Sequence, residues 1–384
     1  MTAPARTGGA PRRPRIAVYA IARNEAPRVE RWATSARDAD QVVLVDTGSS
    51  DGTPDVARRL DVVVHEIEVE PFRFDDARNQ ALGLVPADVD LCIPLDLDEV
   101  LAPGWRRCIE EIWRPDVTRV TFARTWSWSP TQPAHHYRDD RIHGRQGHRW
   151  IRPVHEVPVA STAEVVAHSD VTIEHHRDPG APRPQYLDLL RLAIEEDPTD
   201  GLLAHMLANE HRLRGAPAEA RAWARRALEL SLPVDETAHA LLMLSWLEPA
   251  EREDRLVSAC RVAPDRREPW CELARLHLER RHARAALGAV RAALAVGTAA
   301  EHYLENPAAW AHLPHVQGAA AAEQLGDLDA AVRFARAAAR AAPLDGAVQA
   351  LLHRLVGRLG SADVPVSEPR ASALPPAARR GLQP

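Results

Sequence analysis

The sequence predicts an α/β domain with a mostly parallel sheet, followed by an all-α domain built from repeated helices. Three observations lead to this prediction. In the first part, short apolar runs rich in β-branched residues alternate with polar loops and helical stretches, the pattern of βαβ units. This pattern ends at a cluster of proline and glycine, RDPGAPRP (177–184). Beyond the cluster the pattern is helical and repeats itself.

Apolar runs bounded by turn residues mark the expected strands. Four of them read as buried strands of the α/β domain, namely 15–22, 41–46, 61–69 and 89–96. Two later runs, 118–129 and 165–176, alternate between apolar and polar residues, as strands with one solvated face do. The α/β domain is therefore expected to span residues 15–182.

The helical part shows a period. Turn prolines at 198, 233 and 264 are separated by 35 and 31 residues, near the period of about 34 residues of tetratricopeptide helix pairs. Small residues recur where paired helices must approach closely. We expect a solenoid over 183–360, with 300–316 as its least regular stretch. The ends, 1–14 and 361–384, are rich in Pro, Ala and Arg and are expected to be disordered.

Composition limits the classes of protein. Apolar residues make up 45% of the 384, enough for a buried core, and 48 basic against 54 acidic side chains give a formal charge of −6. This balance argues against a protein that coats nucleic acid or an anionic membrane. Four separated cysteines without a CxxC pair favour a reducing cytoplasm. The chain has no apolar run long enough to span a membrane.

Ligands of open α/β sheets bind beyond the carboxyl ends of the strands. The loop after the first expected strand offers Arg23, Asn24 and Glu25, and the loop after the second runs from Asp46 through Gly48 to Gly52. An acidic side chain there suits a ribose or a base, and the Gly-Ser run lets backbone N–H groups approach a ligand. A turn in which Ser50 or Asp51 caps the next helix explains the second loop equally well.

The loop after the fourth expected strand is more specific. It begins Asp96-Leu97-Asp98-Glu99, and strand alternation places Asp96 and Asp98 on one face. Two carboxylates so placed are suited to Mg²⁺ or Mn²⁺ bound against a diphosphate. Further along, Trp126 and Trp128 share a strand face and are candidates to line an acceptor groove.

These segments together resemble a known family. IARNEAPRVERW, QVVLVDTGSSDGTPDVARRL, FDDARNQAL, LDLDEVL and RPVHE are similar to motifs of family 2 glycosyltransferases with a GT-A fold. The following helices resemble the subgroup that joins such a domain to tetratricopeptide repeats, which includes the sublancin-type peptide S-glycosyltransferases. The resemblance covers roughly residues 15–345.

The resemblance implies a role for each matching residue. Arg23, Asn24, Glu25, Asp46 and Gly48 would line the pocket for a nucleotide, most simply UDP, while Arg78, Asn79 and Asp96 would contact the ribose or the donor sugar. Asp98 and His175 would hold the Mg²⁺ or Mn²⁺ ion. His155 and Glu156 would lie on the acceptor side, with Glu156 as the general base; an ion pair to an arginine such as Arg152 is the structural alternative for Glu156.

The expected activity is metal-dependent, inverting transfer of a hexose from a UDP-sugar to a Ser, Thr or Cys side chain of a peptide or protein. A saccharide or small-molecule acceptor, a nucleotidyltransferase, and a non-catalytic scaffold with a vestigial nucleotide-binding domain are the alternatives. The ARNEAP loop has too little glycine for a nucleotidyltransferase, and the retained acids argue against decay. We expect no nucleic-acid partner, and the helical repeats offer a surface for a homodimer.

Overall fold

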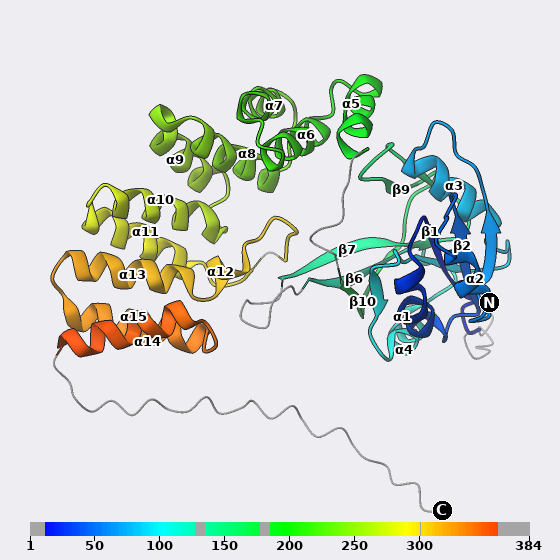
Figure 1. The fold of residues 1–384 in the computed structure, drawn as a ribbon, viewed down its shortest axis with the longest axis horizontal. Coiled ribbons are helices and arrows are strands. Elements are labelled where there is room, and N and C mark those ends of the chain that lie inside the picture. The colour runs from blue at the N-terminus through cyan, green and yellow to red at the C-terminus, as the bar shows by residue number, and fades with distance from the viewer. Residues whose placement is uncertain (1–11, 127–134, 177–184, 300, 360–384) are drawn as a thin grey trace, which may run out of the picture. The chain divides into compact units, whose positions relative to one another are not determined.

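The computed structural model describes residues 12–126, 135–176, 185–299 and 301–359 (Figure 1). The predicted tail from 361, most of the predicted segment 1–14, Trp128 and the breaker cluster at 177–184 lie outside these residues. The chain divides into two compact units. The first runs to Pro269 and includes Thr298–Asn306; the second comprises Trp270–Gly297 and resumes at Pro307. The predicted boundary at 182/183 remains a prediction.

The first unit is built around an eight-stranded sheet with the order β3-β2-β1-β4-β7-β6-β10-β5. β1 pairs in parallel with β2 and β4, β2 with β3, and β6 with β10, whereas β7 and β5 run antiparallel to their neighbours. β8 and β9 form a separate two-stranded sheet. The strands are β1 Ile16–Ala22, β2 Gln41–Asp46, β3 Val63–Glu66, β4 Leu91–Pro94, β5 Glu99–Leu101, β6 Arg119–Trp126, β7 His135–Gly144, β8 His148–Ile151, β9 Val157–Ala160 and β10 Val166–His175.

The predicted fold class, a mostly parallel sheet followed by helices, is confirmed. All six predicted strand regions contain a strand, although β3 is shorter than its apolar run. β5, β7, β8 and β9 were not predicted. In β7 the positions that alternate toward the interior are Tyr137, Asp139 and Arg141, so its inner face is charged and the sequence shows no apolar alternation there.

Helices cover the sheet and fix the loop that follows β4. They are α1 Ala26–Ala36, α2 Thr53–Arg58, α3 Phe74–Leu84 and α4 Trp105–Ile112. Trp32 of α1 is fully buried, and its indole Nε1–H donates to the Leu95 carbonyl at 2.9 Å. Leu97 is buried in the same apolar cluster. These anchors place the neighbouring acidic side chains at the carboxyl edge of the sheet.

Five helices of the repeat region belong to the first unit, together with the short 3₁₀ helix Pro249–Glu251. They are α5 Tyr186–Glu196, α6 Gly201–Leu213, α7 Pro217–Glu229, α8 Val234–Leu247 and α9 Arg252–Val262. α6 packs on α7, and α8 on α9. An apolar cluster that contains Leu190 of α5 and Leu207 of α6 also includes Val154 and Phe74. The first helices are therefore continuous with the core beside the sheet.

The second unit is helical. α10 Arg267–Glu279 begins in the first unit, and the remaining helices are α11 Ala283–Ala295, α12 Pro307–Trp310, α13 Leu313–Gln324, α14 Leu328–Ala341 and α15 Gly346–Leu359. The predicted irregular stretch 300–316 holds little regular structure up to Pro307, among the residues described there. Across the parts of the chain that the structure describes, no helix combines the length and apolar character needed to cross a bilayer.

One close helix contact depends on a glycine. A Cβ added to Gly318 of α13 would lie 2.7 Å from ring atoms of Phe334 on α14, whereas a Cβ at Gly288 of α11 would meet nothing within 4 Å. We expect Gly318→Ala to lower the free energy of unfolding by about 1–3 kcal/mol through overpacking. Gly288→Ala, the matched control, should raise it by about 0.5–1 kcal/mol because alanine restricts the unfolded chain and favours helix. Urea denaturation measures both, and equal stability of the two variants would contradict the close packing.

Candidate active site

The loops after β1 and β2 are joined by side-chain bonds to backbone. Asn24, at φ 58°, donates its backbone N–H to Ser49 Oγ at 2.8 Å, and its Oδ1 accepts from the Ser50 N–H at 2.8 Å. Gly48 has φ 100°, a conformation that glycine adopts without strain. The two loops thus form one structural element at the sheet edge.

Asp46 is buried at the end of β2 and is largely engaged by its own loop. Its Oδ2 accepts from the backbone N–H groups of Gly48 at 3.0 Å and Ser49 at 2.8 Å, and its Oδ1 accepts from the Ser49 hydroxyl. Asp51 accepts from the backbone N–H groups of Thr53 and Ala26, each at 3.0 Å, at the starts of α2 and α1. The N-cap of α2 is Gly52, so the predicted N-cap role of Ser50 or Asp51 is wrong, although Asp51 binds first-turn N–H groups of both helices. A nucleotide contact by Asp46 stays a prediction.

The two remaining residues of the first loop differ in exposure. Arg23 is exposed. Glu25 is half-buried and forms an ion pair with Arg28, and its backbone N–H donates to Thr53 Oγ1 at 2.8 Å. Burial raises the pKa of Glu25, although the Arg28 guanidinium opposes the shift.

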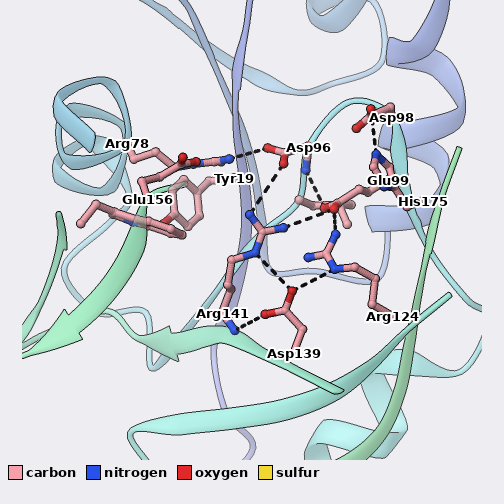
Figure 2. A network of polar contacts seen from close by, with 12 residues as sticks. Tyr19, Arg78, Asp96, Asp98, Glu99, Arg124, Asp139, Arg141, Glu156 and His175 are labelled. Carbon is pink, nitrogen blue, oxygen red and sulfur yellow. Dashed lines mark hydrogen bonds and ion pairs between the residues drawn. The ribbon is translucent and has the colours of Figure 1, made fainter. Parts of the chain in front are cut away.

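Arg78 joins the acidic turn to the RPVHE segment. From α3, its Nη2 donates to Asp96 Oδ1 at 2.6 Å and its Nε to Glu156 Oε1 at 2.8 Å (Figure 2). The side chain is buried and lies over the Trp150 ring, 5.1 Å from its centroid. Nη1 is also buried and has no hydrogen-bond partner among the described residues. A buried cationic N–H without an acceptor is a position at which a ligand oxygen would be bound strongly.

Behind Asp96 lies a layer of buried charges that the sequence did not reveal. Arg124 of β6 pairs with Glu99 and donates from Nε to Asp139 Oδ2 at 2.9 Å. Arg141 of β7 lies between them, with its guanidinium 3.3 Å from Glu99 Oε1, 3.6 Å from Asp139 Oδ2 and 3.8 Å from Asp96 Oδ2. Glu99 also accepts from the Asp96 backbone N–H at 3.0 Å. The layer holds the acidic turn in place from below (Figure 2).

The pKa shifts of four groups in this layer all favour the charged form of the group. Burial alone would raise the pKa of the Asp96 and Asp139 carboxyls, but nearby arginines, Arg78 and Arg141 for Asp96 and Arg124 and Arg141 for Asp139, hold both well below their usual range. Burial likewise opposes the charged form of Arg78 and Arg141, but adjacent carboxylates raise both pKa values. All four groups are therefore ionised near neutral pH.

Asp98 faces His175. The expectation that Asp96 and Asp98 share a strand face does not apply, because β4 ends at Pro94 and both acids lie beyond it. Asp96 turns to the arginines, whereas Asp98 Oδ2 lies 3.0 Å from His175 Nε2 at the end of β10 (Figure 2). A carboxylate oxygen and an imidazole nitrogen at this distance are donor types that would hold Mg²⁺ or Mn²⁺. The described residues contain no group of three or more His, Cys, Asp or Glu able to hold a metal, so further ligands would come from substrate and water.

Asn79 has a structural contact. Its side-chain amide donates to the Trp150 carbonyl at 2.9 Å, and its Oδ1 accepts from the Trp150 N–H at 2.9 Å. Both ends of the amide thus bind β8, and the predicted donor contact by Asn79 finds no support in this geometry.

A buried chain of hydrogen bonds supports Trp150 in turn. Trp150 Nε1–H donates to Tyr19 Oη at 2.8 Å, and Tyr19 Oη lies 3.0 Å from His143 Nε2. Burial lowers the pKa of His143 to about 3, so its imidazole is neutral. This chain connects β1, β7 and β8 beneath Arg78.

The RPVHE segment passes from β8 toward β9 in strained backbone. Arg152 and His155 have φ of 78° and 51°. The Arg152 guanidinium donates to Asp200 Oδ2 at 2.6 Å, so the ion pair weighed for Glu156 forms with Arg78 and not with Arg152. The His155 ring meets that of Tyr186 edge-on, with centroids 5.3 Å apart. Helix contacts on one side and Arg78 on the other therefore position Glu156.

Comparison with known proteins finds a family similarity in the α/β domain. Residues 18–162 match the family model for Glycosyl transferase family 2. A TPR repeat-containing protein from Synechococcus elongatus is 28% identical over 145 residues, 37% of this chain, and the chain spans 35% of that relative's length.

Two solved structures show the range of similarity. Glucosyl-3-phosphoglycerate synthase from Mycobacterium tuberculosis, in complex with Mn²⁺, UDP and glucosyl-3-phosphoglycerate, is 20% identical with a TM-score of 0.25, over 28% of this chain and 43% of that one. A tetratricopeptide repeat protein from Parabacteroides merdae is 16% identical with a TM-score of 0.36, over 45% of this chain and 66% of that one.

The buried charge layer beneath the acidic turn leads to a prediction about stability. Arg124→Met leaves the Glu99 and Asp139 carboxylates short of a buried partner, so we expect the free energy of unfolding to fall by about 3–5 kcal/mol. Arg107→Met removes an exposed ion pair to Glu111 and is the matched control, with a small effect. Urea denaturation compares the two. The double variant Arg124→Met, Glu99→Gln should recover part of the loss, and equal effects of Arg124→Met and Arg107→Met would contradict the role of the layer.

Proposed function

We propose that the protein is a metal-dependent, inverting glycosyltransferase that moves a hexose from a UDP-sugar to a Ser, Thr or Cys side chain of a peptide or protein. One observation carries the proposal: in the segment that matches the family 2 glycosyltransferase model, Asp98 faces His175 and lies on the same acidic turn as Asp96, which Arg78 links to Glu156. A cation site, a buried arginine and a candidate base are thus connected by direct contacts.

Asp98 and His175 would hold Mg²⁺ or Mn²⁺, and the bound ion would neutralise the diphosphate that leaves with the nucleotide. The local charge favours such an ion. Three guanidinium groups, of Arg78, Arg124 and Arg141, face four carboxylates, of Asp96, Glu99, Asp139 and Glu156, which leaves one negative charge before Asp98 is counted.

The residues of the chain divide the remaining work. The Asn24–Ser49 element would receive the nucleotide together with Arg23, Glu25 and Asp46. Arg78 would direct its unpartnered Nη1–H at an oxygen of the donor. Glu156 would take the acceptor proton on Oε2, since Oε1 is bound by Arg78. A new bond then forms between the acceptor heteroatom and the anomeric carbon as the bond from that carbon to the diphosphate oxygen breaks, with inversion.

Two features of the chain support a peptide or protein acceptor. Solenoid surfaces bind extended peptides, and the resemblance to sublancin-type peptide S-glycosyltransferases supports the same choice. A saccharide acceptor is the second candidate. A scaffold with a vestigial domain is disfavoured, because the acidic turn retains an ordered network of partners.

The cation site is tested by UDP binding. We expect Mn²⁺ to strengthen UDP binding by the parent protein, and Asp98→Asn to lose at least about tenfold of that affinity, or 1.4 kcal/mol, because one hard ligand is lost. Calorimetry with Mn²⁺ and with EDTA measures both, and Asp116→Asn, an exposed acid elsewhere, is the control. An unchanged Mn²⁺ effect in Asp98→Asn would remove Asp98 from the cation site. Absence of UDP binding by the parent under both conditions would overturn the proposed donor.

The base is tested separately with Glu156→Gln, whose amide oxygen can still accept from Arg78. Transfer of the hexose from UDP-glucose or UDP-N-acetylglucosamine to water should slow by roughly 10²–10⁴-fold, while UDP affinity changes little. The pH–rate profile should lose the limb that reports the base. Glu111→Gln, on the exposed face of α4, is the control. A rate within threefold of the parent would exclude Glu156 as the base.

A further inference from the structure

Residues 301–306, called here the return loop, contact the sheet of the glycosyltransferase domain. In sequence they lie between α11 and α12, yet Thr298–Asn306 belongs to the first compact unit. The Arg138 backbone N–H on β7 donates to the Glu301 carbonyl at 3.0 Å, and His135 Nε2 lies 3.0 Å from the His302 carbonyl. A segment from the helical half of the chain therefore lies against the edge of β7.

Helices of the first unit anchor the other side of the return loop. The Tyr303 hydroxyl donates to Glu236 Oε1 of α8 at 2.7 Å, and His302 Nε2 lies 3.5 Å from the same oxygen. The Asn306 N–H donates to Glu268 Oε1 at 2.8 Å. Contacts with β7 on one side and with helices on the other therefore fix the conformation of the return loop.

A series of rings leads from the return loop to the candidate cation site. The Tyr303 ring lies 6.4 Å from that of Tyr137, Tyr137 lies 6.1 Å from Trp126, and Trp126 lies 4.6 Å from His175, as centroid distances at steep interplanar angles. Tyr303 is 40% exposed. This aromatic wall, formed by Trp126, Tyr137 and Tyr303, starts beside the residue expected to hold the cation and ends at an exposed ring.

Two buried polar atoms without a partner belong to α8 and α6, one of them on Glu236, whose other carboxylate oxygen binds Tyr303. Glu236 Oε2 and His205 Nδ1 are buried and have no hydrogen-bond partner among the described residues. Both residues are themselves at least nine-tenths buried, and they belong to α8 and α6. A polar atom buried without a partner is destabilising unless a ligand or water supplies one.

The aromatic wall together with the unpartnered polar atoms fits an extended peptide better than a single sugar. Rings contribute stacking surface, and the polar atoms beyond them suit the regularly spaced N–H and C=O groups of an extended peptide, which advances about 3.3 Å per residue. We propose that the return loop forms the acceptor wall of the active site, with Tyr303 stacking on a side chain of a bound peptide. Tyr303 is then a specificity-determining residue. This inference rests on the proposed function.

The test separates acceptor binding from donor binding in the full chain. A library of random peptides, each containing one Ser, Thr or Cys, is incubated with radiolabelled UDP-glucose or UDP-N-acetylglucosamine and Mn²⁺. Tyr303→Ala is expected to reduce peptide labelling at least tenfold through a higher KM, while the Kd for UDP stays within twofold of the parent. Tyr303→Phe keeps the ring and should retain labelling within threefold. Trp246→Ala, an aromatic residue of equal exposure on α8, is the control.

Each of the other possible results contradicts either the role of Tyr303, the peptide acceptor or the proposed function. Labelling of the same peptides at the parent rate by Tyr303→Ala overturns the inference. So does equal loss in Tyr303→Phe and Tyr303→Ala, which would assign the effect to the hydroxyl bond with Glu236. A parallel loss of UDP binding places the effect on the donor side and overturns it as well. A parent that binds UDP but labels no peptide refutes the peptide acceptor and leaves the donor site intact, whereas a parent that does not bind UDP refutes the proposed function itself.

Discussion

The contact on which the site depends is the double engagement of Arg78 with Asp96 and Glu156. Asp96 comes from the turn after β4, Glu156 from the segment after β8, and Arg78 from α3. Both carboxylates are partly withdrawn from solvent, and the buried Arg78 guanidinium supplies the opposite charge that such a position requires. The guanidinium is suited to this task because its donors are fixed in one plane and it stays charged. Donor-side and acceptor-side candidates are thereby kept at fixed separation.

The sequence predicted much of the sheet because its strands are apolar. The β1 run, for example, is almost entirely buried, so its composition reports its location. β7 escaped prediction because Asp139 and Arg141 stand at its interior positions and are satisfied by each other and by residues far away in the chain. Ion pairs between distant segments leave no periodic trace in a sequence.

In the candidate site, too, some residues could be predicted from the sequence and others could not. The acidic turn and the ARN and RPVHE segments were recognised through motifs. Asp98 and His175 face each other, and the metal-binding roles that the resemblance gave them stay a prediction. Arg124, Arg141 and Tyr19 lie in no quoted motif, and Glu99 lies in LDLDEVL without any sign there of its buried contact with Arg124. Asn79 belongs to a recognised motif, but its amide holds Trp150; the motif marked the position without revealing the contact. Which contact a motif residue makes depends on its neighbours in three dimensions.

Segments from the helical half of the chain also pack against the α/β part, in addition to being covalently linked to it. Its Thr298–Asn306 segment returns to the first unit, and α5 and α6 share a core with Val154. Truncation at the end of the predicted α/β domain would thus remove residues that support the RPVHE segment. The helices are part of what keeps that segment folded.

The choice of arginine throughout the charge layer has a consequence for the pH range in which the site keeps its form. Guanidinium groups do not lose their proton in proteins, and burial, the largest effect, holds the pKa of Tyr19 and Tyr137 above the ordinary phenol value. The Asp96 and Asp139 carboxylates, with pKa values held low, contribute stability above the pKa of an unfolded aspartate, and this stability is lost as the pH falls toward their folded values. The layer therefore responds differently to the two directions of pH change. Alkaline solution leaves its charges unchanged, whereas acid protonates its carboxylates and removes its ion pairs.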